Sequence, residues 1–225
     1  MEPLSPRGLA NTATGFATLF AGALPLALCY LSQRHPARWM FVYWTILVTG
    51  VFTITLHGFG ETNPVLGERW LWAFLDTGSN IVVAWAIVLA ALADFYTKKT
   101  QAWARPLATV LMLAGVAWHF YDRYTGGANL IGFGNWGGFK PGQTWLIAFS
   151  LAATALFFIK RKEIAPKAMP ILLLTTAIFV AGLLLATARN DNIVFPFFSL
   201  HAIWHVVGAF GFMALWAFND IRFRK

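Results

Sequence analysis

Residues 196–218 read PFFSLHAIWHVVGAFGFMALWAF, a long run without a single Asp, Glu, Lys or Arg. A helix of about 20 predominantly apolar residues spans the ~30 Å hydrocarbon core of a bilayer. This stretch is therefore expected to cross a membrane. It also carries two histidines, His201 and His205, within the apolar run, so the segment that decides the fold class also raises the question of function.

The composition of the whole chain agrees with a membrane protein. Of its 225 residues, 58% are hydrophobic and 12% are charged, whereas a typical soluble domain has about 45–50% apolar residues, even with Gly counted, and about 25% charged residues. The mean hydropathy is +0.62. The single cysteine, Cys29, excludes an internal disulfide and a zinc site built from cysteines. The net charge of +8 does not indicate nucleic-acid binding, because the basic residues lie in short loops between apolar segments.

Apolar segments long enough to span a membrane occur seven times along the chain. Their limits are 13–31, 38–59, 70–94, 105–121, 143–160, 168–188 and 196–218. The short loops between them leave no room for a soluble domain. We therefore predict an all-α fold, a polytopic membrane protein whose single domain, residues 1–225, is a seven-transmembrane-helix bundle. No convincing cleavage site follows the first segment, so we expect it to be a span and not a removed signal peptide.

The basic residues predict the orientation of this bundle. Twelve of the 17 Lys and Arg residues lie in or beside the 32–37, 95–104 and 161–167 loops and the C-terminal tail. The positive-inside rule then predicts a cytoplasmic C-terminus and an N-terminus outside. We expect the plasma membrane, the bacterial inner membrane or an endomembrane. The glycine-rich 122–142 loop is expected to be a connector on the outer surface, the alternative being a lid or a lipid-entry rim.

Ionisable residues within the predicted spans point to a function, because such groups are costly inside a bilayer. His201 and His205 are four residues apart, a spacing that places two imidazoles on one helix face, where they can share a metal ion. Counting residues from the predicted outer surface places His57 and Asp76 in the same half of the bilayer as this pair. Three imidazoles with an open position and a nearby carboxylate are the outline of a catalytic zinc site.

Four further polar residues have less specific interpretations. His119 and Asp122 close the fourth segment on the same side; His119 could replace a ligand or support one, but its aromatic neighbours favour an interfacial position. Asn80, one turn after Asp76, is expected either to orient that carboxylate or to make an ordinary interhelical hydrogen bond. His35 lies in a predicted loop with no acidic neighbour and is assigned no role.

The residues proposed for the zinc site, together with their neighbours in the sequence, resemble motifs of the alkaline ceramidase family. This family belongs to the wider CREST superfamily of seven-span membrane hydrolases, which also includes the progestin and adipoQ receptors. The similarity rests on Thr53 four residues before His57, on the Leu75-Asp76 start of the third segment, and on the HAIWH sequence at 201–205. The resemblance implies zinc ligands at His57, His201 and His205. It also implies that Asp76 handles the proton of the zinc-bound water, and that Thr53, where the family usually has serine, supplies a hydroxyl near the metal.

Together these observations lead us to expect a zinc-dependent intramembrane lipid hydrolase, most simply an amidase that acts on ceramide or a related N-acyl lipid. Zn²⁺ is the expected cofactor, and the expected partners are a membrane lipid substrate and the bilayer, with no nucleic acid. One alternative is a non-catalytic zinc-containing receptor or sensor of the same architecture. Another is a transporter or haem protein that pairs histidines such as His57 and His119. A retinal protein is not expected, because the seventh segment has no lysine for a Schiff base.

Overall fold

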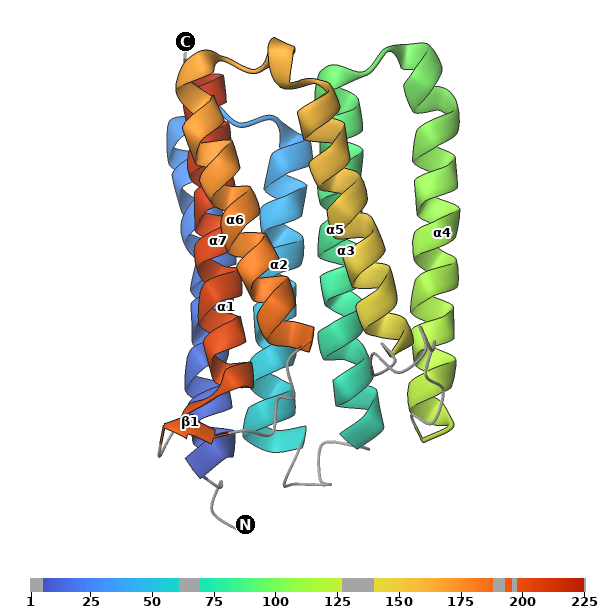
Figure 1. Ribbon diagram of the computed structural model, residues 1–225, viewed down its shortest axis with the longest axis vertical. Helices are drawn as coiled ribbons and strands as arrows, with labels where there is room; N and C mark the ends of the chain where they lie inside the picture. The colour runs from blue at the N-terminus through green and yellow to red at the C-terminus, as the bar shows by residue number, and fades with distance from the viewer. Residues whose placement is uncertain (1–5, 61–68, 127–139, 188–192, 196–197, 225) are drawn as a thin grey trace.

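A computed structural model of the chain describes residues 6–60, 69–126, 140–187, 193–195 and 198–224. Within these residues, long helices run side by side as a bundle, and α1 begins at the end opposite to the one where α7 finishes (Figure 1). The helices are α1 (Pro6–Ser32), α2 (Ala37–Thr55), α3 (Arg69–Phe95), α4 (Lys98–Tyr124), α5 (Pro141–Ile159), α6 (Met169–Thr187) and α7 (Leu200–Phe223).

Short elements join the long helices. A π-helical turn, η1 (Leu56–Gly60), continues α2, and two 3-10 turns, η3 (Arg161–Glu163) and η4 (Pro166–Ala168), connect α5 to α6. Two short strands, β1 (Ile193–Phe195) and β2 (Phe198–Ser199), pair antiparallel just before α7. This strand pair was not expected from the sequence and is a small addition to a helical fold.

Each predicted apolar segment forms a helix, and six helices are long and apolar enough to cross a membrane. These six are α1, α2, α3, α5, α6 and α7, so the chain has the character of a multi-pass membrane protein. The largest difference concerns the predicted 95–104 loop, most of which belongs to α4. There the side chain of Thr97 caps the helix by accepting a hydrogen bond from the Thr100 amide, a signal that hydropathy does not detect.

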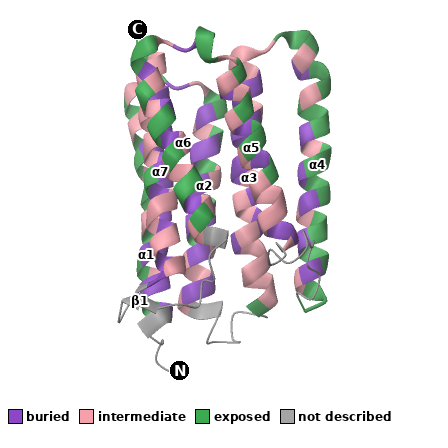
Figure 2. Cartoon of the chain, viewed as in Figure 1, coloured by how far each residue is buried: buried purple, intermediate pink, exposed green. Residues whose placement is uncertain are grey.

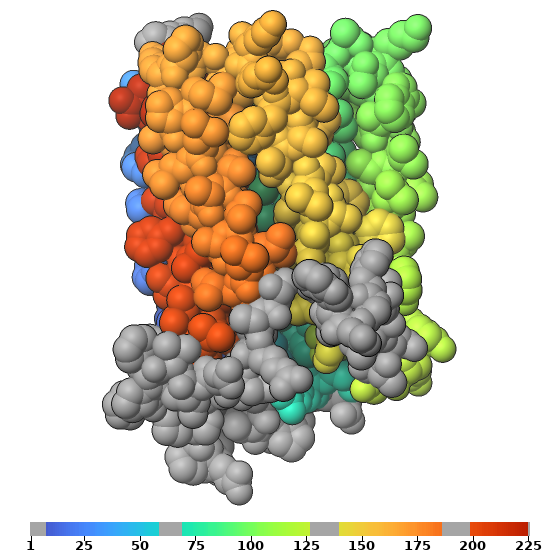
Figure 3. All heavy atoms as spheres, viewed as in Figure 1, coloured from blue at the N-terminus to red at the C-terminus, as the bar shows by residue number. Residues whose placement is uncertain are grey.

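Helix α3 is the central helix of the bundle. In its most apolar window 61% of residues are buried, against 22% in α5 and 22% in α6. Helices α2, α4 and α5 pack on α3, whereas α6 packs on α7, and α7 packs on α1. Among the described residues α5 and α6 are not a closely packed pair, and the space-filling view shows a hollow between them (Figure 3). The exposed residues lie on the outer faces of the bundle, including α4 at its edge (Figure 2).

Glycines bring α1 and α2 into very close contact. A Cβ atom at Gly22 would lie 2.6 Å from Cα of Leu47, and one at Gly50 would lie 2.5 Å from Cα of Leu19. No larger residue fits at either position without moving a backbone, which is how small residues let membrane helices approach each other. This contact holds α1 against α2 along the part of the bundle that leads to the predicted site.

An ion-pair network closes the bundle at the end where α7 finishes. Asp94 of α3 accepts hydrogen bonds from Arg38 and from Trp39 (2.9 Å) of α2 and from Arg222 (2.7 Å) of α7. The side chains of Asp94 and Arg222 are only 2% and 9% exposed. Arg38 and Arg222 belong to the basic residues expected to orient the bundle, and here they also join three helices through one buried carboxylate.

The prediction that His35 has no acidic neighbour is wrong. His35 is buried between α1 and α2, and its Nε2 atom lies 3.6 Å from Oδ1 of Asp220, which is far away in the sequence. The ring also stacks on Trp216 at a centroid distance of 6.4 Å. Burial lowers the pKa of His35, and the nearby Asp220 charge opposes this shift.

Candidate metal centre

The position of His57 depends on the way α2 ends. After Thr55 the helix widens into the π-helical turn η1, and His57, only 3% exposed, lies in this turn. Widened helical turns are uncommon and occur frequently at functional sites, because they change the direction of a side chain relative to a regular α-helix. Here the turn presents the imidazole to the first turns of α7.

The other two histidines lie where α7 begins. Ser199 caps this helix, its hydroxyl accepting a hydrogen bond of 3.1 Å from the amide of Ala202. His201 and His205 follow on consecutive turns of one helix face, with ring centroids 4.5 Å apart. The spacing predicted from the sequence is therefore confirmed. The N-cap fixes where α7 begins, and so fixes how far along the bundle His201 and His205 lie.

The structure brings the three predicted histidines together. Nε2 of His57 lies 3.0 Å from Nε2 of His201, and the His57 ring centroid lies 5.2 Å from that of His205. One ligand nitrogen from each of the three lies within 4.8 Å of the other two. Two nitrogens bound to one tetrahedral zinc ion at ~2.0–2.1 Å would be about 3.3 Å apart, so the His57–His201 spacing is close to that of a metal site.

The buried ring of His205 supports this reading. His205 is 4% exposed, and its Nε2 atom is buried without a hydrogen-bond partner among the described residues. A buried polar atom that lacks a partner costs about 1–3 kcal/mol, and coordination of a metal ion is one way to satisfy it. The three imidazoles therefore fit a metal ion both by their spacing and by this bare nitrogen.

The predicted carboxylate lies beside the turn that carries His57. Thr53, one turn before His57, donates a hydrogen bond of 2.5 Å to Oδ1 of Asp76, and both side chains are buried. Asp76 is not one of the three mutually close ligands. The predicted role of Asn80 in orienting the carboxylate is not the one observed, because its side chain donates to the main-chain oxygen of Asp76 within α3 at 2.9 Å.

His119 lies outside the cluster, and its side chain packs inside the bundle, unlike the exposed Trp118, Tyr121 and Tyr124 that suggested an interfacial position. Its side chain is fully buried, 5.7 Å from the Phe74 ring between centroids, and a Cβ at Gly142 would lie 2.7 Å from its Nδ1 atom. Asp122 is equally buried. A helix carrying Trp and Tyr residues suggested an interface, but the side chain of His119 turns inward toward α3 and α5.

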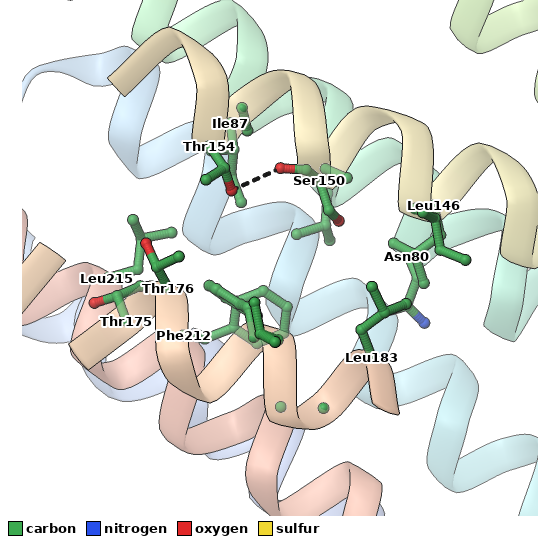
Figure 4. Close-up of a pocket in the computed structure, with 18 of the residues that line it drawn as sticks. Asn80, Ile87, Leu146, Ser150, Thr154, Thr175, Thr176, Leu183, Phe212 and Leu215 are labelled. Atoms are coloured by element: carbon green, nitrogen blue, oxygen red, sulfur yellow. Dashed lines mark hydrogen bonds between the residues drawn. The ribbon is translucent and has the colours of Figure 1, made fainter. Parts of the chain in front are cut away.

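A cavity leads away from His205 through the apolar part of the bundle. Both His205 and Thr53 line this cavity, which is partly open to the outside. Figure 4 shows Asn80 and Leu183 toward one end of this cavity and Leu215 toward the other. The α6 residues that line it run from Leu172 to Leu183, about 16 Å at 1.5 Å per residue.

The walls of the cavity are apolar despite their threonines. The hydroxyl of Thr154 donates to the Ser150 carbonyl at 2.9 Å (Figure 4), and that of Thr175 donates to the Ile171 carbonyl at 2.7 Å. Since these hydroxyls are satisfied within their own helices, they do not require polar groups from a ligand. The cavity therefore suits a hydrocarbon chain.

Helix α1 contributes residues that the sequence analysis did not assign to the site. Thr14 Oγ1 lies 3.1 Å from Nδ1 of His205, and Oδ1 of Asn11 accepts a hydrogen bond of 3.0 Å from the Ser199 hydroxyl. Both side chains are buried. The available signal was the recurrence of polar residues at helical spacing (Asn11, Thr14 and Thr18) at and just before the start of the apolar first segment.

The chain matches no family model, no curated protein and no solved structure. The interpretation of the site therefore depends on its geometry: three imidazoles that could hold a metal ion, a buried carboxylate fixed by a hydroxyl, and an apolar cavity that begins beside them.

Proposed function

We propose that this chain is a zinc-dependent intramembrane hydrolase that cleaves the amide bond of ceramide or a related N-acyl lipid. One observation carries the proposal. The cluster of His57, His201 and His205, in which Nε2 of His205 has no partner among the described residues, adjoins an apolar cavity. Thr53, the hydrogen-bond partner of Asp76, also lines this cavity. A site that only binds metal has no need of such a cavity, whereas a lipid hydrolase needs the two together.

The proposal includes a seven-span topology with the N-terminus outside and the C-terminus in the cytoplasm. Among the described residues, α1 begins and α7 finishes at opposite ends of the bundle, as an odd number of crossings would produce (Figure 1). Although α4 is not among the six most apolar helices, its exposed side chains include Leu107, Val110 and Leu113, which suit contact with lipid. The histidines then lie in the outer half of the plasma membrane, the bacterial inner membrane or an endomembrane.

Three imidazoles with an open fourth position are one of the protein ligand sets of catalytic zinc ions. When bound, such an ion would polarise the substrate carbonyl and make a coordinated water molecule acidic enough to attack near neutral pH. His57, His201 and His205 are neutral nitrogen donors in this role. His57 and His205 are buried, which limits the access of bulk water to the reacting bond.

Asp76 acts as the general base and then as the general acid. It accepts a proton from the attacking water while the water oxygen bonds to the acyl carbon, and it delivers this proton to the amine nitrogen as the C–N bond breaks. The products are a fatty acid and a free amine. Thr53 holds the carboxylate in place through its hydrogen bond, and because a hydroxyl has one proton, it can donate to an oxyanion only after releasing Asp76.

The cavity supports an acyl lipid as the substrate. Its length of about 16 Å along α6 corresponds to roughly half of the ~30 Å hydrocarbon core, the thickness of one leaflet. An acyl chain in the cavity would bring its carbonyl carbon to the end that His205 lines. The amide, as opposed to an ester, follows from the resemblance to the alkaline ceramidases.

The test is a screen of the purified, zinc-loaded protein against ceramides and other N-acyl lipids, with matched O-acyl esters, in which released fatty acid is measured by mass spectrometry. We expect release from at least one N-acyl lipid and its loss in His201→Ala. A protein that holds zinc but releases no fatty acid from any of these lipids would contradict the proposal and would favour the receptor or sensor alternative.

A further inference from the structure

We propose that Thr14 of α1 is a positioning residue that fixes the tautomer of His205, so that Nδ1 carries the proton and the Nε2 lone pair faces the metal. The inference depends on the metal site of the proposed function and goes beyond it, since it assigns a role to a helix that supplies none of the three histidines. Thr14 and His205 are far apart in the sequence, but Thr14 Oγ1 and His205 Nδ1 lie 3.1 Å apart and both side chains are buried.

The direction of this hydrogen bond follows from the partners of the Thr14 hydroxyl. Its oxygen lies 2.8 Å from the main-chain oxygen of Ala10 and 3.2 Å from that of Asn11. A carbonyl oxygen only accepts, and a hydroxyl has one proton and two lone pairs. The Thr14 proton is therefore used on α1 itself, and a lone pair remains to accept a proton from Nδ1 of His205.

The direction of this hydrogen bond decides where the ring carries its proton. With the Thr14 hydroxyl as the acceptor, Nδ1 of His205 is the donor. A neutral imidazole has only one N–H group, so Nε2 is left as a bare lone pair. This is the buried nitrogen that lacks a partner among the described residues.

Helix α1 also holds the N-terminus of α7 in place, and with it the position of His205. The side chain of Asn11 accepts a hydrogen bond from Ser199, and the same Ser199 hydroxyl caps the helix through the amide of Ala202. One face of α1 thus contacts both the N-terminus of α7 and the His205 ring, which lies about one and a half turns further along α7. Groups that orient a ligand histidine in this way typically change metal affinity by about 10- to 100-fold when they are removed.

The test measures zinc affinity of the full-length protein in detergent by competition with a chromophoric chelator. Thr14→Val replaces the hydroxyl with a methyl group of similar size, Thr14→Ser keeps the hydroxyl, and Thr49→Val is the matched control. Thr49 is also a buried helical threonine, but its hydroxyl donates to the Thr45 carbonyl within α2. We expect Thr14→Val to weaken zinc binding about 10- to 100-fold, and Thr14→Ser and Thr49→Val to stay near wild type.

Equal affinity of Thr14→Val and wild type would overturn the inference and leave the proposed function intact, whereas a wild-type protein without zinc affinity would overturn both. A second measurement needs no variant at this position. This measurement is the ¹⁵N spectrum of histidine-labelled, zinc-loaded wild type. The signals of His205 are assigned by their absence in His205→Asn. We expect them to show a proton on Nδ1. Protonation at Nε2 would contradict the inference even if Thr14→Val failed to fold.

Discussion

The hydroxyl of Thr53 donates a hydrogen bond of 2.5 Å to the carboxylate of Asp76, across the interface between α2 and α3. Because Thr53 lies one turn before His57, one helical turn supplies both a candidate metal ligand and the group that holds the candidate base. The relative position of ligand and base is therefore set within a few residues of the chain, and changes at either residue have separable consequences.

Substitution of Asp76 by Asn is expected to abolish hydrolysis and leave metal binding intact. The amide has nearly the same shape as the carboxylate but cannot accept the proton of the attacking water, and general base catalysis contributes about 10²- to 10⁴-fold to the rate. The measurement is the rate of fatty-acid release together with zinc content. Ser79→Ala is the control, since the hydroxyl of Ser79 donates to the main-chain oxygen of Asp76 within α3 at 2.8 Å. An Asp76→Asn protein of normal activity would remove Asp76 from the mechanism.

Two substitutions of Thr53 distinguish the role of its hydroxyl from that of its methyl group. Thr53→Ser keeps the donor to Asp76 and restores the residue usual in the resembling family, so we expect activity close to wild type. Thr53→Val removes the donor; a hydrogen bond to a charged group contributes about 1.5–3 kcal/mol, which corresponds to roughly a 10- to 100-fold loss of rate. Equal rates for the two variants would show that the hydroxyl has no part in catalysis.

The cavity predicts a limit on chain length. Leu215 lies toward the end of the cavity opposite Asn80 and Leu183 (Figure 4), and ten residues of α7, about 15 Å, separate it from His205. A bulkier side chain in Leu215→Trp would shorten the space for the acyl tail, so the rate should fall selectively for long-chain lipids and change little for short ones. The control is Val110→Trp on the exposed face of α4. A uniform loss across all chain lengths would indicate that the tail does not lie in this cavity.

The ring of His35 predicts an effect of pH on stability. Burial lowers the pKa of His35 below its ordinary value of about 6.5, so below pH 6.5 the unfolded chain binds a proton that the folded protein does not. Stability is therefore lost as the pH falls from 6.5 toward the folded pKa, by at most about 1.4 kcal/mol per pH unit. His35→Phe should lose less thermal stability than wild type between pH 7.5 and 5.5. Parallel losses in both proteins would rule out His35 as the cause.

Much of the fold could be predicted from the sequence because apolar runs of spanning length leave few structural alternatives. Each expected segment formed a helix, and the i, i+4 spacing of His201 and His205 placed them on one face, as local geometry requires. The start of α4 could not be predicted in this way. Its first turn is polar and is defined by the Thr97 cap, to which a hydropathy window is insensitive.

Contacts between distant segments were less accessible from sequence. The approach of His57 to α7 depends on the π-helical turn after α2, for which the sequence carries no pattern we could read. Asp220 lies beside His35 only because the end of α7 packs against the α1–α2 connection. The role of α1 was missed for the same reason: a threonine in an apolar helix becomes informative only when its partner, here His205, is known.

The central claim is tested most directly by the metal content of the purified protein, measured by inductively coupled plasma mass spectrometry for wild type, His201→Ala and His119→Gln. His119 is a buried histidine outside the cluster, so its variant controls for nonspecific effects of losing a buried imidazole. We predict one zinc ion per chain in wild type and His119→Gln and almost none in His201→Ala. Wild-type protein without zinc, or His201→Ala with a full complement of zinc, would contradict the account.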